Sequence, residues 1–200
     1  MIQPATFRSQ APAPLQPHPI TLPAAQELVL PNGLTVVVVE DKRLPLVSYR
    51  LGFRVGGAFD PPGLPGLTDL LAALLPEGTE SMTSREIADE VARMGANLSA
   101  GTNSDYTIVG ASALSQFNDR MLELIADVTL RPSFPEKEVE LAKQNTKESL
   151  RQQRAQPSFL ATEMLARVMF GDHPYSIVSP TPESIDRSSR DEFVNFLRSK

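Results

Sequence analysis

The stretch GLPGLTDLLAALLPEGT, residues 63–79, decides the fold of this chain. Its apolar side chains recur at the three- and four-residue spacing of one helical face, at Leu70, Leu71, Leu74 and Leu75. This spacing predicts an amphipathic helix over Thr68–Leu75. The pair Gly66-Leu67 opens the helix and Gly78-Thr79 ends it.

Two strand-forming segments precede this helix. LVLPNGLTVVVVED, residues 28–41, places Asn32-Gly33 between apolar runs, which is typical of a β-hairpin turn. Thr35–Val39 is β-branched and apolar on both faces, so we expect a strand that is buried on both sides. Val47–Val55 alternates, and its Arg50 and Arg54 are expected to face water.

Helical periodicity dominates the rest of the chain. Ser84–Met94 follows a Thr/Ser cap with Glu86 nearby, and Gly95 supplies the end of that helix. Further helices are predicted over residues 116–130, 136–156, 158–169 and 189–197, with breaks at Arg131-Pro132 and at Pro157.

Composition narrows the class of protein. Two hundred residues with 41% hydrophobic content fit one sizeable globular domain. The net charge of -5 and the absence of basic runs argue against a nucleic-acid surface, and the absence of cysteine excludes disulfides and thiol chemistry. The apolar run Leu34–Val39 is too short to span a bilayer.

The N-terminal segment differs from the remainder. Residues 1–26 are proline-rich and predict an extended arm, whereas a globular pattern fills residues 27–200. Neither a basic region nor an apolar run of the kind found in signal peptides follows Met1, and a chain whose signal had been removed would look the same. The compartment is therefore left open: periplasmic if a signal peptide was removed, and otherwise cytoplasmic.

Several segments, in order, resemble the insulinase and pitrilysin zinc peptidases, which include proteins like the mitochondrial processing peptidase. The helix segment resembles a family pattern close to G-L-A-H-x-L-E-H-x-L-F-x-G-T. The other matching segments are residues 28–41, 46–66, 84–114 and 134–185. The resemblance implies an α+β fold, with a mixed, largely antiparallel sheet and helices packed on one face. It also implies a closing strand and a second similar domain, so we expect residues 27–200 to stop before the domain's last strand.

The zinc chemistry of that family is missing here. The family's His, Glu and His positions are occupied by Asp69, Ala72 and Ala73, which share one helical face by their spacing. We therefore predict no catalytic residues, no metal and no cofactor, although active relatives use zinc. Replacing the three residues with His, Glu and His is expected to be sterically tolerated.

Two carboxylates are the remaining candidates for a metal ligand. Asp69 is either such a ligand or a helix N-terminal aspartate stabilised by the helix dipole. Glu148 lies close to the family's third ligand in sequence, and is otherwise a solvated or salt-bridged helix residue. The histidines, His18 in the arm and His173 in a His-Pro-Tyr loop, form no site unless the arm folds back.

The segment NLSAGT is the candidate peptide-binding strand. By resemblance it is an edge strand that pairs with the substrate backbone, formed by Asn97, Leu98, Ser99, Ala100, Gly101 and Thr102. Backbone pairing needs no particular side chain, so peptide binding could survive the loss of catalysis. The alternative is an ordinary edge strand protected by a partner domain.

These observations predict a non-catalytic insulinase-like module, of bacterial type, that partners an active zinc-peptidase domain or subunit and helps to enclose unstructured peptides. The alternatives are a degenerate active zinc metallopeptidase with atypical ligands, and a purely structural scaffold subunit. We expect self-association through an unpaired sheet edge, and we expect neither a nucleic-acid partner nor a membrane span.

Overall fold

The structure is a computed structural model that describes residue 15 and residues 23–200. The chain divides into two compact units, Met1–Leu44 and Pro45–Lys200. Most of the predicted arm at residues 1–26 lies outside the described residues, and the first strand begins at Ala25.

The described part of the first unit is a β-hairpin. Strands β1 (Ala25–Val29) and β2 (Thr35–Val39) pair antiparallel, and Gly33 turns the chain with φ of 85°. The Leu30 amide donates to the carbonyl of Leu34 at 2.9 Å, which closes the turn. The Asn-Gly signal therefore marks the turn correctly.

The prediction that Thr35–Val39 is buried on both faces is wrong. Val37, Val38 and Val39 are 59%, 46% and 55% exposed. The reason is that, among the residues that the structure describes, β2 pairs only with β1, and a two-stranded ribbon has no second layer of its own to cover either face.

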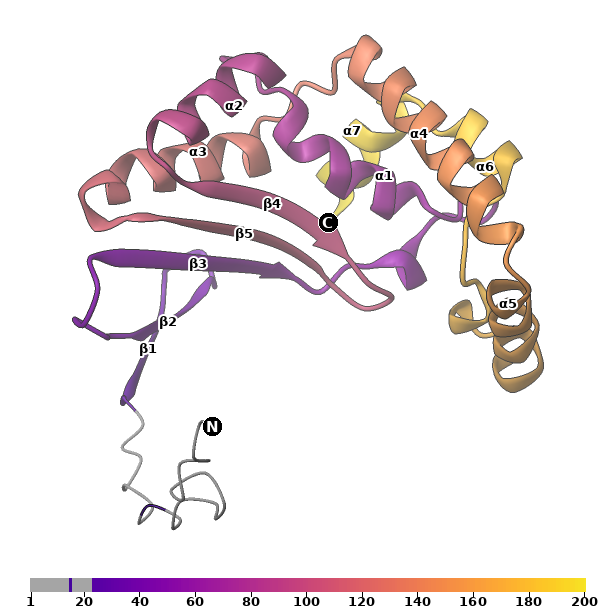
Figure 1. The fold of residues 1–200 in the computed structure, drawn as a ribbon, viewed down its shortest axis with the longest axis horizontal. Helices are drawn as coiled ribbons and strands as arrows, with labels where there is room; N and C mark the ends of the chain where they lie inside the picture. The colour runs from indigo at the N-terminus through magenta and orange to yellow at the C-terminus, as the bar shows by residue number, and fades with distance from the viewer. Residues whose placement is uncertain (1–14, 16–22) are drawn as a thin grey trace, which may run out of the picture. The chain divides into compact units, whose positions relative to one another are not determined.

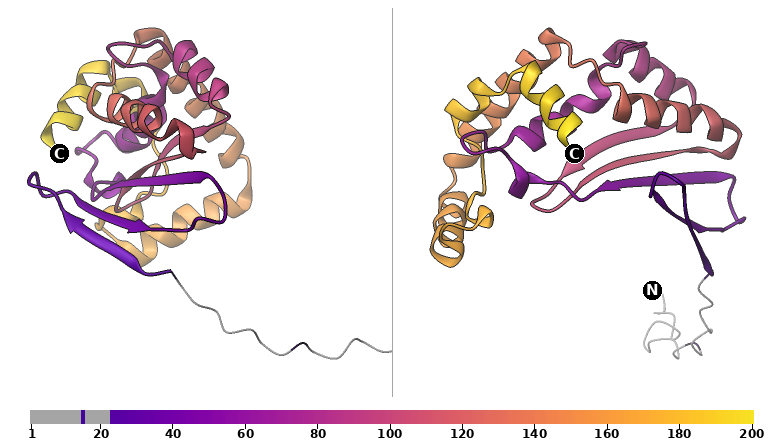
Figure 2. Two further views of the ribbon diagram at one scale, coloured as in Figure 1. Left: turned by 90° about the vertical axis from the view of Figure 1, so that its left-hand side faces the viewer. Right: turned by 180° about the vertical axis from the view of Figure 1, so that it is seen from behind.

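The second unit has two layers, a sheet and a cover of helices. Strands β3 (Leu46–Phe53), β4 (Asn97–Thr102) and β5 (Thr107–Leu114) form an antiparallel sheet in the order β3-β5-β4. Most of the helices pack on one face of this sheet, as Figures 1 and 2 show. Their bounds are α1 Leu67–Leu74, α2 Ser84–Arg93, α3 Asn118–Leu130, α4 Glu136–Arg154, α5 Pro157–Phe170, α6 Pro182–Arg187 and α7 Arg190–Ser199.

The core lies between the sheet and the helices. Helix α1 buries Leu67, Leu70, Leu71 and Leu74, which are at most 5% exposed. Alternate residues of the strands face this layer: Leu98, Ala100, Val109 and Ala111 belong to the core or pack against it. The opposite face of the sheet is not covered by the helices of this unit (Figure 1).

The ends of the helices follow local chemistry. Thr83 and Glu86 form a capping box at the start of α2, in which each side chain accepts from the other residue's amide. Gly95 follows that helix with φ of 57°. The sequence pattern missed α6, a six-residue helix that a second capping box at Thr181 and Ser184 begins.

Helix α5 departs from the pattern of the other helices. It extends away from the helical layer in both Figure 1 and Figure 2, and of its residues only Ala166 is buried. Its apolar side chains are therefore largely open to solvent, including Met164, Leu165, Val168 and Met169.

These elements confirm the predicted α+β class with helices packed on one face of a sheet. Both sheets are antiparallel throughout the described residues. Within that same part of the chain, no helix combines the length and the apolar character needed to cross a bilayer.

A matched pair of leucines on α3 tests the packing. Leu124 is 1% exposed and Leu122 is 46% exposed. We expect Leu124→Ala to lower the free energy of unfolding by about 2–5 kcal/mol, because it leaves a cavity in the core. Leu122→Ala should cost less than about 1 kcal/mol. Urea denaturation of both variants measures the difference, and equal losses would contradict this packing.

Candidate functional site

Helix α1 carries the three positions where the resembling family places its zinc motif. Asp69 and Ala73 lie one helical turn apart, and both are exposed. Ala72 is only 1% exposed, so its methyl group belongs to the interior. The three side chains therefore do not form one accessible surface. The burial of Ala72 weighs against the expectation that a glutamate fits there without steric conflict, and that expectation stays a prediction.

Asp60 fixes the start of α1 from outside the helix. Its carboxylate accepts hydrogen bonds from the amides of Gly66 (2.7 Å) and Thr68 (2.9 Å) and from the Thr68 hydroxyl (2.5 Å). Burial raises the pKa of Asp60, and these hydrogen bonds oppose the rise. Asp60 thus caps a helix whose own N-cap, Gly66, has no side chain to do so.

Asp69 lies in the first turn of α1, where the helix dipole favours a negative charge. The residue is exposed, but the protein around it desolvates the carboxyl, and the negative charge of Asp60 also disfavours ionisation. Both effects raise the pKa of Asp69. Asp69 is therefore a helix-terminal carboxylate beside a second carboxylate, with no histidine close in sequence.

The donor set does not fit a zinc ion. Ala72 and Ala73 offer no donor atom, and Glu148 on α4 forms an ion pair with Arg151 at 3.2 Å. Both side chains of that pair are more than half exposed. Within the described residues no group of three or more His, Cys, Asp or Glu residues could hold a metal, whereas a catalytic zinc needs about three protein ligands.

Strand β4 lies at an edge of the sheet, because in the described part of the chain β5 is its only partner. Within the described residues, no backbone hydrogen bond joins Asn97–Thr102 to any segment other than β5. The outer edge of β4 therefore presents free amide and carbonyl groups.

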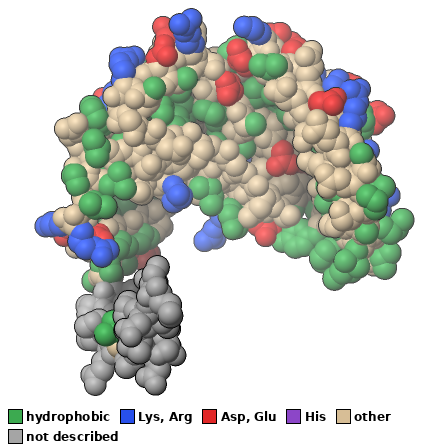
Figure 3. Space-filling view, viewed as in Figure 1, with side chains coloured by type: hydrophobic (Ala, Val, Ile, Leu, Met, Phe, Trp, Pro, Cys, Tyr) green, Lys and Arg blue, Asp and Glu red, His purple; other side chains and the backbone are tan. Residues whose placement is uncertain are grey.

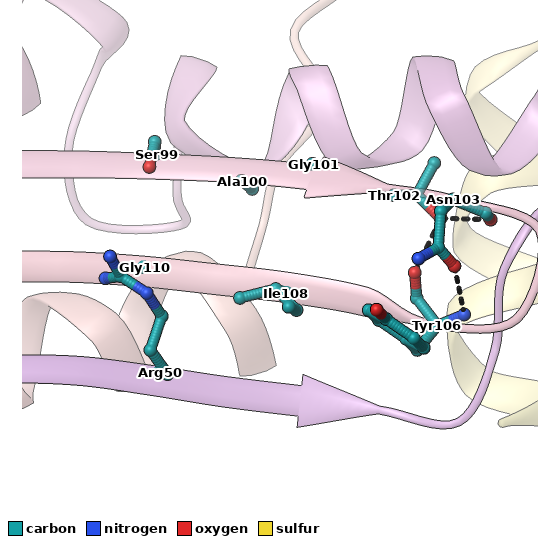
Figure 4. Close-up of a pocket in the computed structure, with 9 residues that line it drawn as sticks. All are labelled: Arg50, Ser99, Ala100, Gly101, Thr102, Asn103, Tyr106, Ile108 and Gly110. Atoms are coloured by element: carbon teal, nitrogen blue, oxygen red, sulfur yellow. Dashed lines mark hydrogen bonds between the residues drawn. The ribbon is translucent and has the colours of Figure 1, made fainter.

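A hollow of about 480 Å³ lies on the open face of the sheet beside this edge (Figure 4). Small side chains form most of its floor, because Ser99, Gly101 and Gly110 all face this side. Arg50 and Tyr106 stand at its two ends, with Ile108 between them. The remaining lining residues are Ala100, Thr102 and Asn103.

Side-chain hydrogen bonds hold the turn from β4 to β5 at one end of the hollow. The Asn103 side-chain oxygen accepts from the amides of Asp105 (2.8 Å) and Tyr106 (3.0 Å). The Tyr175 hydroxyl donates to Asp105 at 2.5 Å, and this bond joins the His-Pro-Tyr loop to the turn. His173 accepts from the Tyr175 amide at 3.2 Å, which makes it part of that loop. His18 lies outside the described residues.

Sequence reasoning singled out the edge strand but missed the hollow. It placed Arg50 in water, and Arg50 is indeed exposed, yet its side chain also borders the hollow. The sequence alone does not reveal the register of the strands, which places Arg50, Gly110 and Ser99 in one row across the sheet. Asp60 was also missed, because it caps a helix that begins seven residues later in the sequence.

Comparisons with known proteins agree with this architecture. The chain is 27% identical over 168 residues to an uncharacterized zinc protease of Rickettsia bellii, covering 84% of this chain and 41% of that protein. It is 24% identical over 158 residues to the non-peptidase homolog YmxG of Helicobacter pylori, covering 78% and 37%.

A solved structure shows the same fold. The peptidase M16 inactive domain from Pseudomonas fluorescens superposes with a TM-score of 0.82 at 28% identity, covering 86% of this chain and 42% of that one. The chain thus spans about two fifths of the length of these proteins. Residues 35–181 match the family described as Insulinase (Peptidase family M16). The chain therefore belongs to the insulinase family of peptidases, family M16.

Proposed function

We propose that this chain is a non-catalytic insulinase-like module that binds extended peptides along β4 and works beside a catalytically competent domain or subunit of the same family. The observation that carries the proposal is the unpaired edge of β4 beside an open hollow, in a domain whose zinc-motif helix has no ligand set.

The absence of metal-binding and proton-accepting atoms at Ala72 and Ala73 supports the proposed loss of catalysis. A family peptidase needs a metal to activate water and a general base to take its proton. Neither alanine methyl can bind a metal or accept a proton, and the two remaining carboxylates are insufficient. This argues against an active peptidase with atypical ligands.

The geometry of the edge supports the proposed peptide binding. In an antiparallel pair, hydrogen-bonded and non-hydrogen-bonded positions alternate. The Asn103 amide donates to Tyr106 across the turn at 3.0 Å, so the amides of Thr102, Ala100 and Leu98 are expected to point away from β5. An extended peptide can add to them as a further strand.

The names of two relatives support the non-catalytic part of the proposal. The Helicobacter pylori protein is named a non-peptidase homolog, and the Pseudomonas fluorescens structure is of an inactive domain. A catalytic partner would supply the zinc site, while this chain would hold part of the peptide. A purely structural scaffold would share the fold but would bind no peptide. Self-association remains a prediction that sedimentation velocity tests.

The first prediction concerns zinc. We expect the purified chain to hold far less than one zinc ion per molecule and to unfold at the same temperature with and without EDTA, because its donor set is incomplete. It should also leave unstructured peptides uncleaved. Elemental analysis and a peptidase assay measure this; stoichiometric zinc that is lost in Asp69→Ala, or chelator-sensitive cleavage, would disprove it.

The second prediction compares neighbouring alanines on α1. Ala72→Glu should lower the free energy of unfolding by about 2–4 kcal/mol, because it forces a carboxylate into the interior without a partner. Ala73→Glu should change it by less than about 0.5 kcal/mol, because position 73 is exposed. Thermal and urea denaturation compare the two, and an equally stable Ala72→Glu variant would show that position 72 opens onto solvent.

The third prediction tests strand pairing from the side of the ligand, so that the protein is not altered. We expect unstructured peptides to bind, and we expect binding to be lost when alternate backbone amides are N-methylated, because a paired strand donates through every second amide. For a peptide that pairs with β4 in a single register, methylating the other set of alternate amides should leave binding intact, because those amides point away from β4. Fluorescence anisotropy measures both series. Equal binding by both would exclude pairing with β4, and no binding by any peptide would favour the scaffold.

A further inference from the structure

We infer that the hollow beside β4 recognises a carboxylate of the bound peptide through Arg50, and that the site therefore selects acidic peptides. This inference rests on the proposed function, since it requires a peptide at the β4 edge. It adds a substrate class that the backbone edge alone would not specify.

The residues opposite Arg50 leave room for its side chain on the open face of the sheet. It pairs in register with Gly110, which in turn pairs with Ser99 (Figure 4). A Cβ at position 110 would lie 3.0 Å from Nη1 of Arg50 and 3.5 Å from Oγ of Ser99. Glycine at 110 thus leaves the space in which the guanidinium crosses the sheet toward β4.

The guanidinium has unused hydrogen-bonding capacity. Nη1 donates to the Tyr49 carbonyl at 2.9 Å, and within the described residues Arg50 has no ion pair. Other exposed arginines do have one: Arg93 lies 2.9 Å from Glu90, and Arg131 lies 2.6 Å from Asp127. Since a guanidinium has five N–H donors, Arg50 can still bind a carboxylate at two points.

The lining of the hollow favours a bound anion, because it contains a cation and no carboxylate that would compete for it. The residues that line the hollow are neutral apart from Arg50, although the chain has a net charge of -5. The space-filling view shows basic side chains on the underside of the sheet (Figure 3). A peptide carboxylate entering here meets one cation and no competing carboxylate.

Geometry favours a long acidic side chain. A strand added to β4 would lie about 10 Å from β5, two strand spacings away. Its side chain must therefore reach back across β4, where Ser99 is small enough to let it pass. An extended arginine and a glutamate can meet over Ser99, whereas an aspartate is shorter by one methylene.

The neighbouring row supplies a different environment. Gly52, Ile108 and Gly101 form the next open-face row, two residues along each strand. Ile108 makes this row apolar, and the phenol of Tyr106 stands beyond it. Because side chains alternate along a strand, moving a glutamate by one residue turns it to the other face, and moving it by two places it over Ile108.

The experiment measures peptide affinity by fluorescence anisotropy at low salt. The probes are short unstructured peptides, N-acetylated and C-terminally amidated, with one glutamate moved through the central positions and a glutamine counterpart for each. We expect the best glutamate peptide to bind wild type about fivefold more tightly than its glutamine counterpart, as an exposed ion pair allows. A further arm compares a free and an amidated C-terminus, to learn whether the carboxylate comes from a side chain or from the chain end.

Two variants make the test specific. Arg50→Gln should abolish the preference for glutamate while binding the glutamine peptide as wild type does, which also shows that it is folded. Arg54→Gln, which removes the same charge from an exposed arginine outside the hollow, should keep the preference. Equal affinity of wild type for both peptides, or a preference that survives in Arg50→Gln or disappears in Arg54→Gln, would overturn the inference alone. If wild type binds none of the peptides, the proposed function fails and the inference fails with it.

Discussion

The burial of α1 against the three-stranded sheet is the interaction on which the rest of the second unit depends. Leu67 and Leu74 are fully buried, and the helix contacts β4 and α4. Each leucine side chain contributes about 1.5–3 kcal/mol when it leaves water. The same helix packs against β4, so it supports the edge strand that we propose as the binding site.

The start of α1 shows how a long-range contact replaces a local one. Gly66 adopts φ of 90°, and a Cβ there would lie 2.7 Å from Pro180. The glycine is therefore required twice, for its backbone angle and for the close approach of another segment. Asp60 then supplies the helix cap that glycine cannot. Neither partner is adjacent to the helix in the sequence, which is why the local pattern did not reveal them.

Local periodicity predicted most of the fold, and its failures have physical causes. The leucine spacing placed α1 to within one residue at each end, and the Asn-Gly pair placed the hairpin turn. Apolar composition alone misjudged the exposure of Val37 and its neighbours, because burial depends on what covers a strand. At the site, the sequence identified the missing zinc ligands and the segment that forms β4. The hollow escaped prediction because it arises from a register that brings Arg50 opposite Gly110.

The contacts between α1 and the C-terminal part of the chain have a consequence for synthesis on the ribosome. The Ser184 hydroxyl donates to the carbonyl of Pro65 at 2.8 Å, across 119 residues, and Ile185 and Phe193 complete the core. Domains fold as units during translation, so the leucine face of α1 emerges long before its last covering residues exist. The nascent chain therefore carries an uncovered apolar helix until residues 184–193 have been made, and this interval is when a chaperone that holds apolar segments would matter most to the yield of folded protein.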